Sequence, residues 1–341
     1  TKAITNEDKD KIHEAEKLLI EKEKQIKLAN NQIDEARKEI EIHRLENKNK
    51  NTLLIFSTSI LGLFVILIFI LIKNNKERKQ SNLLLAEKNK EVIDSIKYAQ
   101  RLQSAILPPI SSIKKNLKES FILYQPKDIV SGDFYWIENI DEHVTLFAVV
   151  DCTGHGVPGA FMSIVAYNAL NQALNQHKLI KPAEILNQLN IDITKMLHQS
   201  DNIDVEDGMD ISLCLLNTKT NELQYAGAYH SLNLLRNGEL KIVNGDKFSI
   251  GSTRGKNKIY KNHNFKLEKG DYIYTFSDGF ADQFGGKKER KFMYKNLRNL
   301  LVLNSNKEVD EQSSILLTEL NKWKGNLEQV DDICVMGVKI V

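Results

Sequence analysis

The stretch VVDCTGHGVPGAFM, residues 149–162, marks the point where an apolar strand is expected to end and a helix to begin. It places a carboxylate, a thiol, an imidazole and three glycines close together along the chain. Such a stretch is compatible with a phosphate-binding loop, a cysteine nucleophile or a metal site. Which of these it forms decides what kind of domain surrounds it.

Two of these sites lack a residue that they require. Pro158 stands where a cysteine phosphatase has its phosphate-binding arginine, so we interpret the Cys152 thiol as structural. The Gly-Lys-Ser/Thr end of a nucleotide P-loop is also missing. His155 lies between two glycines and is compatible with a base or with a turn residue bonded to the backbone. Asp151 and the neighbouring main-chain carbonyl therefore remain as metal ligands, and Pro158 is expected to start the next helix at its N1 position.

The C-terminal two thirds of the chain alternates short β-rich runs with amphipathic helices. Strands are predicted at residues 144–150, 210–217, 222–228, 232–243 (a hairpin turning at Asn-Gly), 271–277 and 332–341. Helices are predicted at residues 158–176, 182–199, 292–303 and 308–323. This grouping predicts an α+β layered domain.

Aspartates recur beside the apolar strands of this domain. Asp133 is expected on a strand, Asp151 and Asp278 at strand ends, and Asp331 with Asp332 at the start of the last strand. Each alone is typical of a turn residue or a helix cap. Together, uncompensated carboxylates at one end of a sheet would repel unless a cation neutralised them. Carboxylate oxygens favour hard ions such as Mg²⁺ or Mn²⁺ over zinc.

The N-terminal part of the chain predicts long helices. Isoleucine or leucine recurs every seventh residue from Ile12 to Ile40, which is typical of a coiled coil; an amphipathic helix closing a helical-repeat domain is the alternative. Residues 53–72 carry no charge and match the length of a single transmembrane helix. Basic residues flank both ends, so the positive-inside rule does not fix its orientation. A second heptad helix over residues 85–106 is expected to stop at Pro108 and Pro109.

Global composition excludes several classes of function. The net charge is +2 with 27% charged residues, so nothing global indicates a nucleic-acid partner. Three widely spaced cysteines argue against a disulfide framework or a structural zinc site and suit a reducing compartment.

Seven segments together resemble a known family. SGDFYW, VVDCTGHGVPGAFMS, DGMDISLCLLN, YAGAYHSLNLLRNGEL, FSIG, LEKGDYIYTFSDGFADQFGG and EQVDDICVMGV occur in the order found in SpoIIE/RsbU-type bacterial serine phosphatases of the metal-dependent protein phosphatase 2C superfamily. The resemblance covers residues 93–341. It implies a β-sandwich of two antiparallel sheets flanked by helices. The expected domains are a helical or coiled-coil segment (1–51), a transmembrane helix (52–73), a regulatory linker helix (74–110) and a phosphatase domain (111–341).

The resemblance also implies a site. Two Mn²⁺ or Mg²⁺ ions would be held by Asp133, Asp151, the Cys152 backbone carbonyl, Asp278 and Asp331. The cations would share a water whose pKa they lower, and the resulting hydroxide would attack the phosphorus atom in line.

The sequence departs from the family pattern at two positions. Asp210 is an additional acid near the sheet, which we do not assign as a ligand. His230 lies two residues later than the histidine of the usual Asn-Ala-Gly-His segment, so the pattern does not support a substrate-contacting role for it.

The implied function is that of a membrane-anchored phosphatase acting on phosphoserine or phosphothreonine of a protein. The implied substrate class is the anti-sigma-factor antagonists, and the helical segments are expected to make a homodimer. The catalytic domain is expected on the cytoplasmic side of the inner membrane. The alternative is a non-catalytic module that keeps the fold and binds a phosphoprotein; a nucleotide hydrolase is disfavoured because no nucleotide fingerprint is present.

Overall fold

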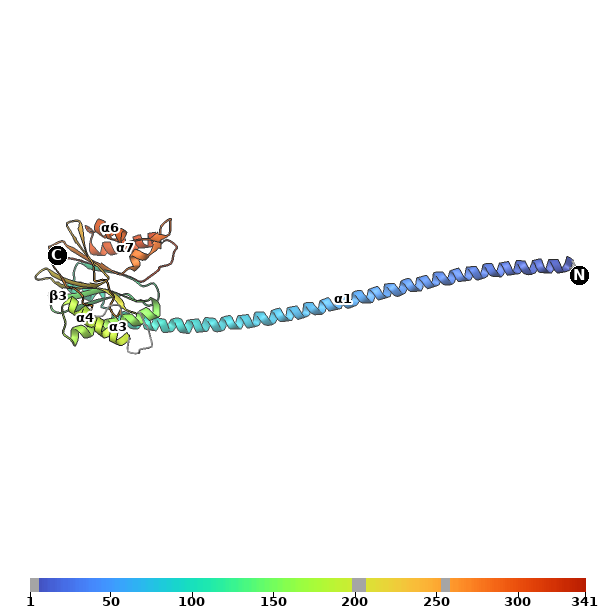
Figure 1. Ribbon diagram of the computed structural model, residues 1–341, viewed down its shortest axis with the longest axis horizontal. Coiled ribbons are helices and arrows are strands. Elements are labelled where there is room, and N and C mark those ends of the chain that lie inside the picture. Colours follow the sequence, from blue (N-terminus) through green and yellow to red (C-terminus); the bar gives the residue numbers. More distant parts are fainter. Residues whose placement is uncertain (1–5, 198–206, 253–257) are drawn as a thin grey trace. The chain divides into compact units, whose positions relative to one another are not determined.

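A computed structural model describes residues 6–197, 207–252 and 258–341 (Figure 1). Contacts within the chain divide it between Lys88 and Asn89 into two units, which are described separately below. The predicted domain boundaries remain a prediction, since this division concerns contacts alone.

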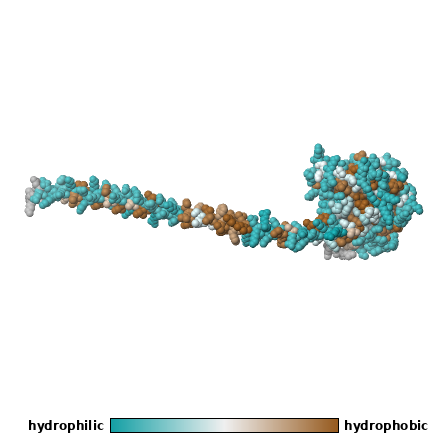
Figure 2. Space-filling model, turned by 180° about the vertical axis from the view of Figure 1, so that it is seen from behind, coloured by the Kyte–Doolittle hydropathy of each residue, from teal (hydrophilic) through white to brown (hydrophobic). Residues whose placement is uncertain are grey.

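The N-terminal residues form helix α1, Asn6–Ile106, which ends just before Pro108 and Pro109 as expected. Within it, the large apolar side chains of residues 53–72 are exposed on all sides of the helix, and Figure 2 shows them as a brown band bordered by teal. In length and composition this helix could cross a membrane. The heptad residues Ile12, Leu19, Ile26, Ile33 and Ile40 are also exposed. The coiled coil therefore stays a prediction.

The second unit contains the remaining elements. Its other helices are α2 Ile110–Asn116, α3 Gly156–Asn175, α4 Pro182–Leu197, α5 Gly279–Asp282, α6 Tyr294–Leu303 and α7 Val309–Lys324. Its strands are β1 Ser120–Gln125, β2 Phe134–Asn139, β3 Val144–Cys152, β4 Met209–Asn217, β5 Glu222–Ala228, β6 Leu232–Arg236, β7 Glu239–Val243, β8 His263–Lys266, β9 Tyr272–Phe276, β10 Phe284–Gly285, β11 Arg290–Lys291 and β12 Ile333–Lys339.

Ten of the described strands form two sheets with antiparallel neighbours. One has the order β1-β12-β9-β6-β7 and the other β2-β3-β4-β5-β8, while β10 and β11 make a separate small ribbon. Figure 1 shows α3 and α4 on one side of the sheets and α6 and α7 on the other. The predicted β-sandwich of two antiparallel sheets flanked by helices is confirmed.

Alternation of side chains along the strands builds three cores. In β2, Phe134 and Trp136 face α3 and α4, whereas Tyr135 and Ile137 face the second sheet. The third core packs residues of β1, β9 and β12 against α6 and α7. Central strands such as β3 are buried on both faces, which explains their continuous apolar sequence.

The sequence did not predict β1, β8 or the β10–β11 ribbon. Strands β8 and β11 are short and lie at edges, so half or more of their side chains are exposed and they lack a long apolar run. Helix α3 begins at Gly156 rather than at Pro158, so the predicted N1 position of Pro158 is wrong by two residues. His155 is the residue that precedes the helix; it is extended, and Gly154 and Gly156 on either side of it have positive φ.

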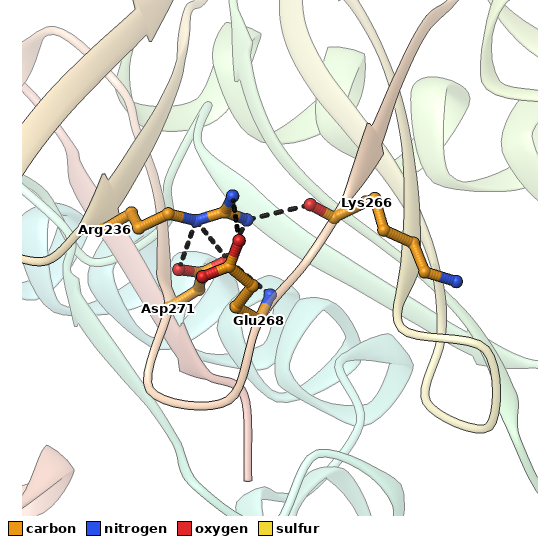
Figure 3. Close-up of polar contacts among 4 residues, drawn as sticks. All are labelled: Arg236, Lys266, Glu268 and Asp271. Atoms are coloured by element: carbon orange, nitrogen blue, oxygen red, sulfur yellow. Dashed lines mark hydrogen bonds and ion pairs between the residues drawn. The ribbon is translucent and has the colours of Figure 1, made fainter.

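An ion pair between Arg236 and the buried Asp271 holds the turn between β8 and β9 (Figure 3). Arg236, at the end of β6, donates from Nε to Asp271 Oδ1 at 2.9 Å and from Nη2 to Asp271 Oδ2 at 2.6 Å. It also donates to Glu268 Oε1 at 2.8 Å and to the Lys266 carbonyl at 2.8 Å. Asp271 is only 2% exposed, so this bidentate pair ties the end of β6 to the turn between β8 and β9.

Candidate metal centre

The first acid of the site comes from the central strand of one sheet. Asp151 is the next-to-last residue of β3, and it lies opposite Asp210 of β4 in the register of the sheet. Strand β3 is buried up to Val150, so the strand carries Asp151 directly out of the core. Burial raises the pKa of Asp210, and the charge of Asp151 adds to that rise.

His230 lies against Asp151. Its Nε2 is 3.6 Å from Asp151 Oδ2, and its side chain is only 7% exposed. Burial lowers the pKa of His230, but the hydrogen bond and charge of Asp151 outweigh burial and raise it overall. The departure from the Asn-Ala-Gly-His pattern thus does not keep this histidine away from the site.

Asp133 lies in the loop one residue before β2, not on the strand as predicted. Its side chain is 2% exposed, and Oδ2 has no hydrogen-bond partner among the described residues. Burial raises the pKa of Asp133 well above its ordinary value, and the charge of Asp151 raises it further. A buried carboxylate oxygen without a donor destabilises the fold, because its hydrogen bonds to water are lost and no protein hydrogen bond replaces them.

Two further acids come from the other sheet. Asp278 follows β9 and precedes α5, and Asp331 lies shortly before β12. Burial, then the charges of Asp151 and Asp331, raise the pKa of Asp278 to about 7. Burial also raises the pKa of Asp331, with Asp151 again among the causes. The fold therefore brings the four predicted carboxylates to one end of the sandwich, within electrostatic reach of one another.

Asp332 has a role that the sequence did not predict. Its Oδ1 accepts a hydrogen bond from the Lys127 backbone N–H at 2.7 Å, and its Oδ2 accepts one from the Gly132 N–H at 2.8 Å. Both carboxylate oxygens of Asp332 therefore accept hydrogen bonds from the loop that carries Asp133. The pair of acids at residues 331 and 332 was visible in the sequence, but nothing there shows which one faces the site.

The glycines bring these loops into close contact. A Cβ on Gly132 would collide with the Gly154 carbonyl oxygen and lie 3.1 Å from the carbonyl oxygen of Cys152. A Cβ on Gly279 would collide with the carbonyl of Asp332. Only glycine allows these backbones to approach so closely.

The thiol and the imidazole of the 149–162 stretch have other surroundings. The Cys152 side chain is buried, and burial raises its thiol pKa well above the ordinary value, which does not suit a nucleophile. His155 Nδ1 lies 2.9 Å from Asp128 Oδ2, and its Nε2 lies 2.9 Å from Lys127 Nζ. Its side chain is bonded to side chains of the neighbouring loop, and not to the backbone.

The residues fit a hard cation in chemistry. The donors are carboxylate oxygens and one carbonyl, which Mg²⁺ and Mn²⁺ prefer. The orphaned Asp133 oxygen and the raised carboxyl pKa values indicate negative charge without a compensating cation. As they stand, no three Asp, Glu, His or Cys side chains of the described ranges come close enough to ligate one ion.

Comparison with known proteins identifies the fold. The sequence model of the SpoIIE family, described as stage II sporulation protein E, matches residues 141–341. The structure resembles the SiaA-PP2C domain of Pseudomonas aeruginosa with 32% identity and a TM-score of 0.67, covering 74% of this chain and 98% of that one. A search of curated proteins found no match.

A more distant solved structure shares the fold. It is the PP2C phosphatase domain with a fragment of the regulatory domain of SpoIIE from Bacillus subtilis. It matches with 18% identity and a TM-score of 0.53, over 65% of this chain and 63% of that one. The domain is therefore a PP2C-type phosphatase domain. The chain belongs to the SpoIIE family, among the SpoIIE/RsbU-type PP2C serine/threonine phosphatases.

Proposed function

We propose that this chain is a membrane-anchored, divalent-cation-dependent phosphatase that removes phosphate from serine or threonine of a protein. The observation that carries the proposal is the convergence of Asp133, Asp151, Asp278 and Asp331 from both sheets, where burial and neighbouring negative charge raise the pKa values of Asp133, Asp278 and Asp331. Family membership supports the reaction class.

We assign the metal-binding role to Asp133, Asp151, the Cys152 carbonyl, Asp278 and Asp331, for two Mn²⁺ or Mg²⁺ ions. When bound, such ions supply an acidified water as nucleophile and positive charge that screens the phosphoryl oxygens. The carboxylates hold the ions in place and do not themselves act as acids or bases.

Other residues of the chain support these ligands. Asp332 fixes the Lys127–Gly132 loop and with it the position of Asp133. His230 lies 3.6 Å from Asp151 and limits the orientations open to that carboxylate. Ligands held by such neighbours lose less freedom when an ion binds, which favours binding.

The test compares the full chain with Asp151→Asn and Asp278→Asn in detergent. Wild type is expected to hydrolyse p-nitrophenyl phosphate with added Mn²⁺ and to lose this activity on chelation. Each variant is expected to lose it at least about 100-fold while keeping its thermal unfolding transition. Asp310→Asn on α7, whose carboxylate only contacts Lys114 on the surface, is the matched control. Full turnover by either site variant, or a wild type inert with Mn²⁺, would reject the proposal; the second result would favour the non-catalytic binding module.

The membrane and the partners are part of the same proposal. Residues 53–72 would anchor the chain, with the catalytic domain on the cytoplasmic side and the helical segments joining two copies. The substrate class follows from the family resemblance: small phosphorylated anti-sigma-factor antagonists. Phosphoproteomics comparing wild type with an Asp278→Asn strain tests it, since a substrate should gain phosphate in the variant.

A further inference from the structure

A cavity of about 240 Å³ opens beside Asp278. Asp278 and His230 line one part of it, and Tyr294 and Arg298 of helix α6 line another. The cavity thus joins the candidate metal centre to an arginine that the family motifs quoted above do not include.

Arg298 is fixed in this cavity from two sides. Its Nε donates a hydrogen bond to Asn233 Oδ1 at 3.0 Å. Asn233 is fully buried, and its own amide donates to the Tyr274 carbonyl at 3.4 Å, so its orientation is set by the sheet. The guanidinium carbon also lies 5.4 Å from the centre of the Tyr294 ring. The geometry therefore restricts the guanidinium to one place at the cavity wall.

The terminal nitrogens of Arg298 have no anionic partner in the part of the chain that the structure describes. Within the described ranges, neither of them makes a hydrogen bond or an ion pair, although the side chain is partly buried. Arg236, by contrast, is paired with Asp271 and Glu268. Burial lowers the pKa of Arg298, which nevertheless stays charged at neutral pH. A partly desolvated cation with free donors is an incomplete site that an anion would complete.

Two residues with a strained backbone conformation lie in or next to segments that line this cavity. Tyr229, which lines it, has a φ of 53°, and Met293, directly before α6, has a φ of 74°. Neither residue is glycine, so each conformation is maintained by its surroundings at some cost. The Tyr229 N–H donates to the Asp246 carbonyl at 2.8 Å and the Met293 N–H to the Ala281 carbonyl at 2.7 Å. Such strain is typical of segments that position side chains for a ligand.

We propose that Arg298 binds the phosphoryl group of the substrate, with Asn233 and Tyr294 as positioning residues. This inference rests on the proposed function. The free nitrogens of a guanidinium match two phosphoryl oxygens in a forked arrangement that a lysine ammonium does not reproduce. Asp278 on the same cavity places the bound group next to the cluster of carboxylates.

The experiment measures kcat and KM of the full chain with Mn²⁺ for p-nitrophenyl phosphate and for a phosphoserine peptide. Arg298→Ala is expected to raise KM about 10- to 100-fold for both substrates, because charge-assisted hydrogen bonds are lost from each. Arg298→Lys is expected to recover part of the loss. Arg290→Ala, on the exposed strand β11, is the matched control and should change neither constant.

A binding measurement separates this inference from the proposed function. Calorimetric titration with inorganic phosphate, with and without Mn²⁺, should show weaker binding to Arg298→Ala by about the same factor. An active wild type with unchanged KM and phosphate affinity in Arg298→Ala would overturn the inference and leave the proposed function standing. A KM rise for the peptide alone would also overturn it, because Arg298 would then contact the polypeptide. If wild type is inert with Mn²⁺, the proposed function fails, and the titration alone decides whether Arg298 binds phosphate.

Discussion

Replacing Gln103 with alanine is expected to loosen the loop that carries Asp133 while the sandwich stays folded. Gln103 lies near the end of α1, and its side chain is 4% exposed. Its Nε2 donates to the Ser131 carbonyl at 2.6 Å and to Ser163 Oγ at 2.8 Å, and its Oε1 accepts from the Ser131 N–H at 3.1 Å. The side chain thus joins the linker helix to the residue two positions before Asp133.

The magnitude follows from these three bonds. Each contributes about 0.5–1.5 kcal/mol, so the three together contribute about 1.5–4.5 kcal/mol, and the buried groups of Ser131 and Ser163 that lose their partner place the cost in the upper part of that range. A domain is stable by about 5–15 kcal/mol, so the chain should remain folded. Alanine is the best helix former, so weakening of α1 does not explain the effect. The loss falls on the Ser131–Asp133 segment and should appear as weaker metal binding.

The assay is phosphatase activity of the full chain as a function of Mn²⁺ concentration, with thermal unfolding beside it. Gln103→Ala is expected to need at least about tenfold more Mn²⁺ for half-maximal activity. A tenfold change corresponds to about 1.4 kcal/mol, which is less than the free energy lost with the three hydrogen bonds. The control is Gln172→Ala on α3, where Nε2 contacts only Gln176 on the surface; it should behave as wild type. An unchanged Mn²⁺ requirement in Gln103→Ala would refute the coupling between this helix and the Asp133 loop.

Three further outcomes are expected. Gly132→Ala should reduce turnover at least about 100-fold, because its Cβ meets backbone at Gly154 and Cys152; normal turnover would contradict the close approach. Arg236→Ala should lower the free energy of unfolding by about 1–3 kcal/mol in denaturant titrations, because the buried Asp271 carboxylate loses its bidentate partner and keeps the hydrogen bond from the Glu268 N–H, whereas Lys266→Ala should have little effect. In EDTA, the raised pKa of Asp278, about 7, means that the folded chain binds more protons than the unfolded one. The stabilising contribution of Asp278 should be complete below about pH 4 and should be lost as the pH rises through 7. Added Mn²⁺ should reverse this trend. A Tm that does not change with pH in EDTA would contradict the prediction.

Features of the domain that depend on local pattern could be predicted from the sequence. The buried run of β3 and the Asn-Gly hairpin between β6 and β7 follow from apolar continuity and turn chemistry. The layered α+β architecture follows from the grouping of such elements. The quoted motifs added the sandwich topology, which periodicity alone does not specify.

Contacts between distant segments could not be predicted in this way. His230 reaches Asp151 only because the turn before it places Tyr229 at a positive φ and is anchored by the Tyr225 hydroxyl, which donates to the His230 carbonyl. The hydrogen bonds between Asp332 and the Lys127–Gly132 loop join residues that are 200 or more positions apart. Neither contact leaves a periodic signal in the sequence, because each depends on how the two sheets pack.

The backbone contacts explain how acids from separate sheets can be held near one another despite their repulsion. The Asp332 carboxylate binds the loop of Asp133, Gly132 of that loop packs on the Cys152 carbonyl, and Gly279 packs on the Asp332 carbonyl. The segments that carry the four acids are thus tied to one another by close backbone approaches at Gly132 and Gly279 and by the hydrogen bonds of the Asp332 carboxylate. The electrostatic cost then falls on the carboxyl groups themselves, as their raised pKa values indicate. A cation bound among these carboxylates would lower that cost. The clustered carboxylates therefore lower the stability of the folded domain at this end of the sandwich, and bound positive charge would restore it.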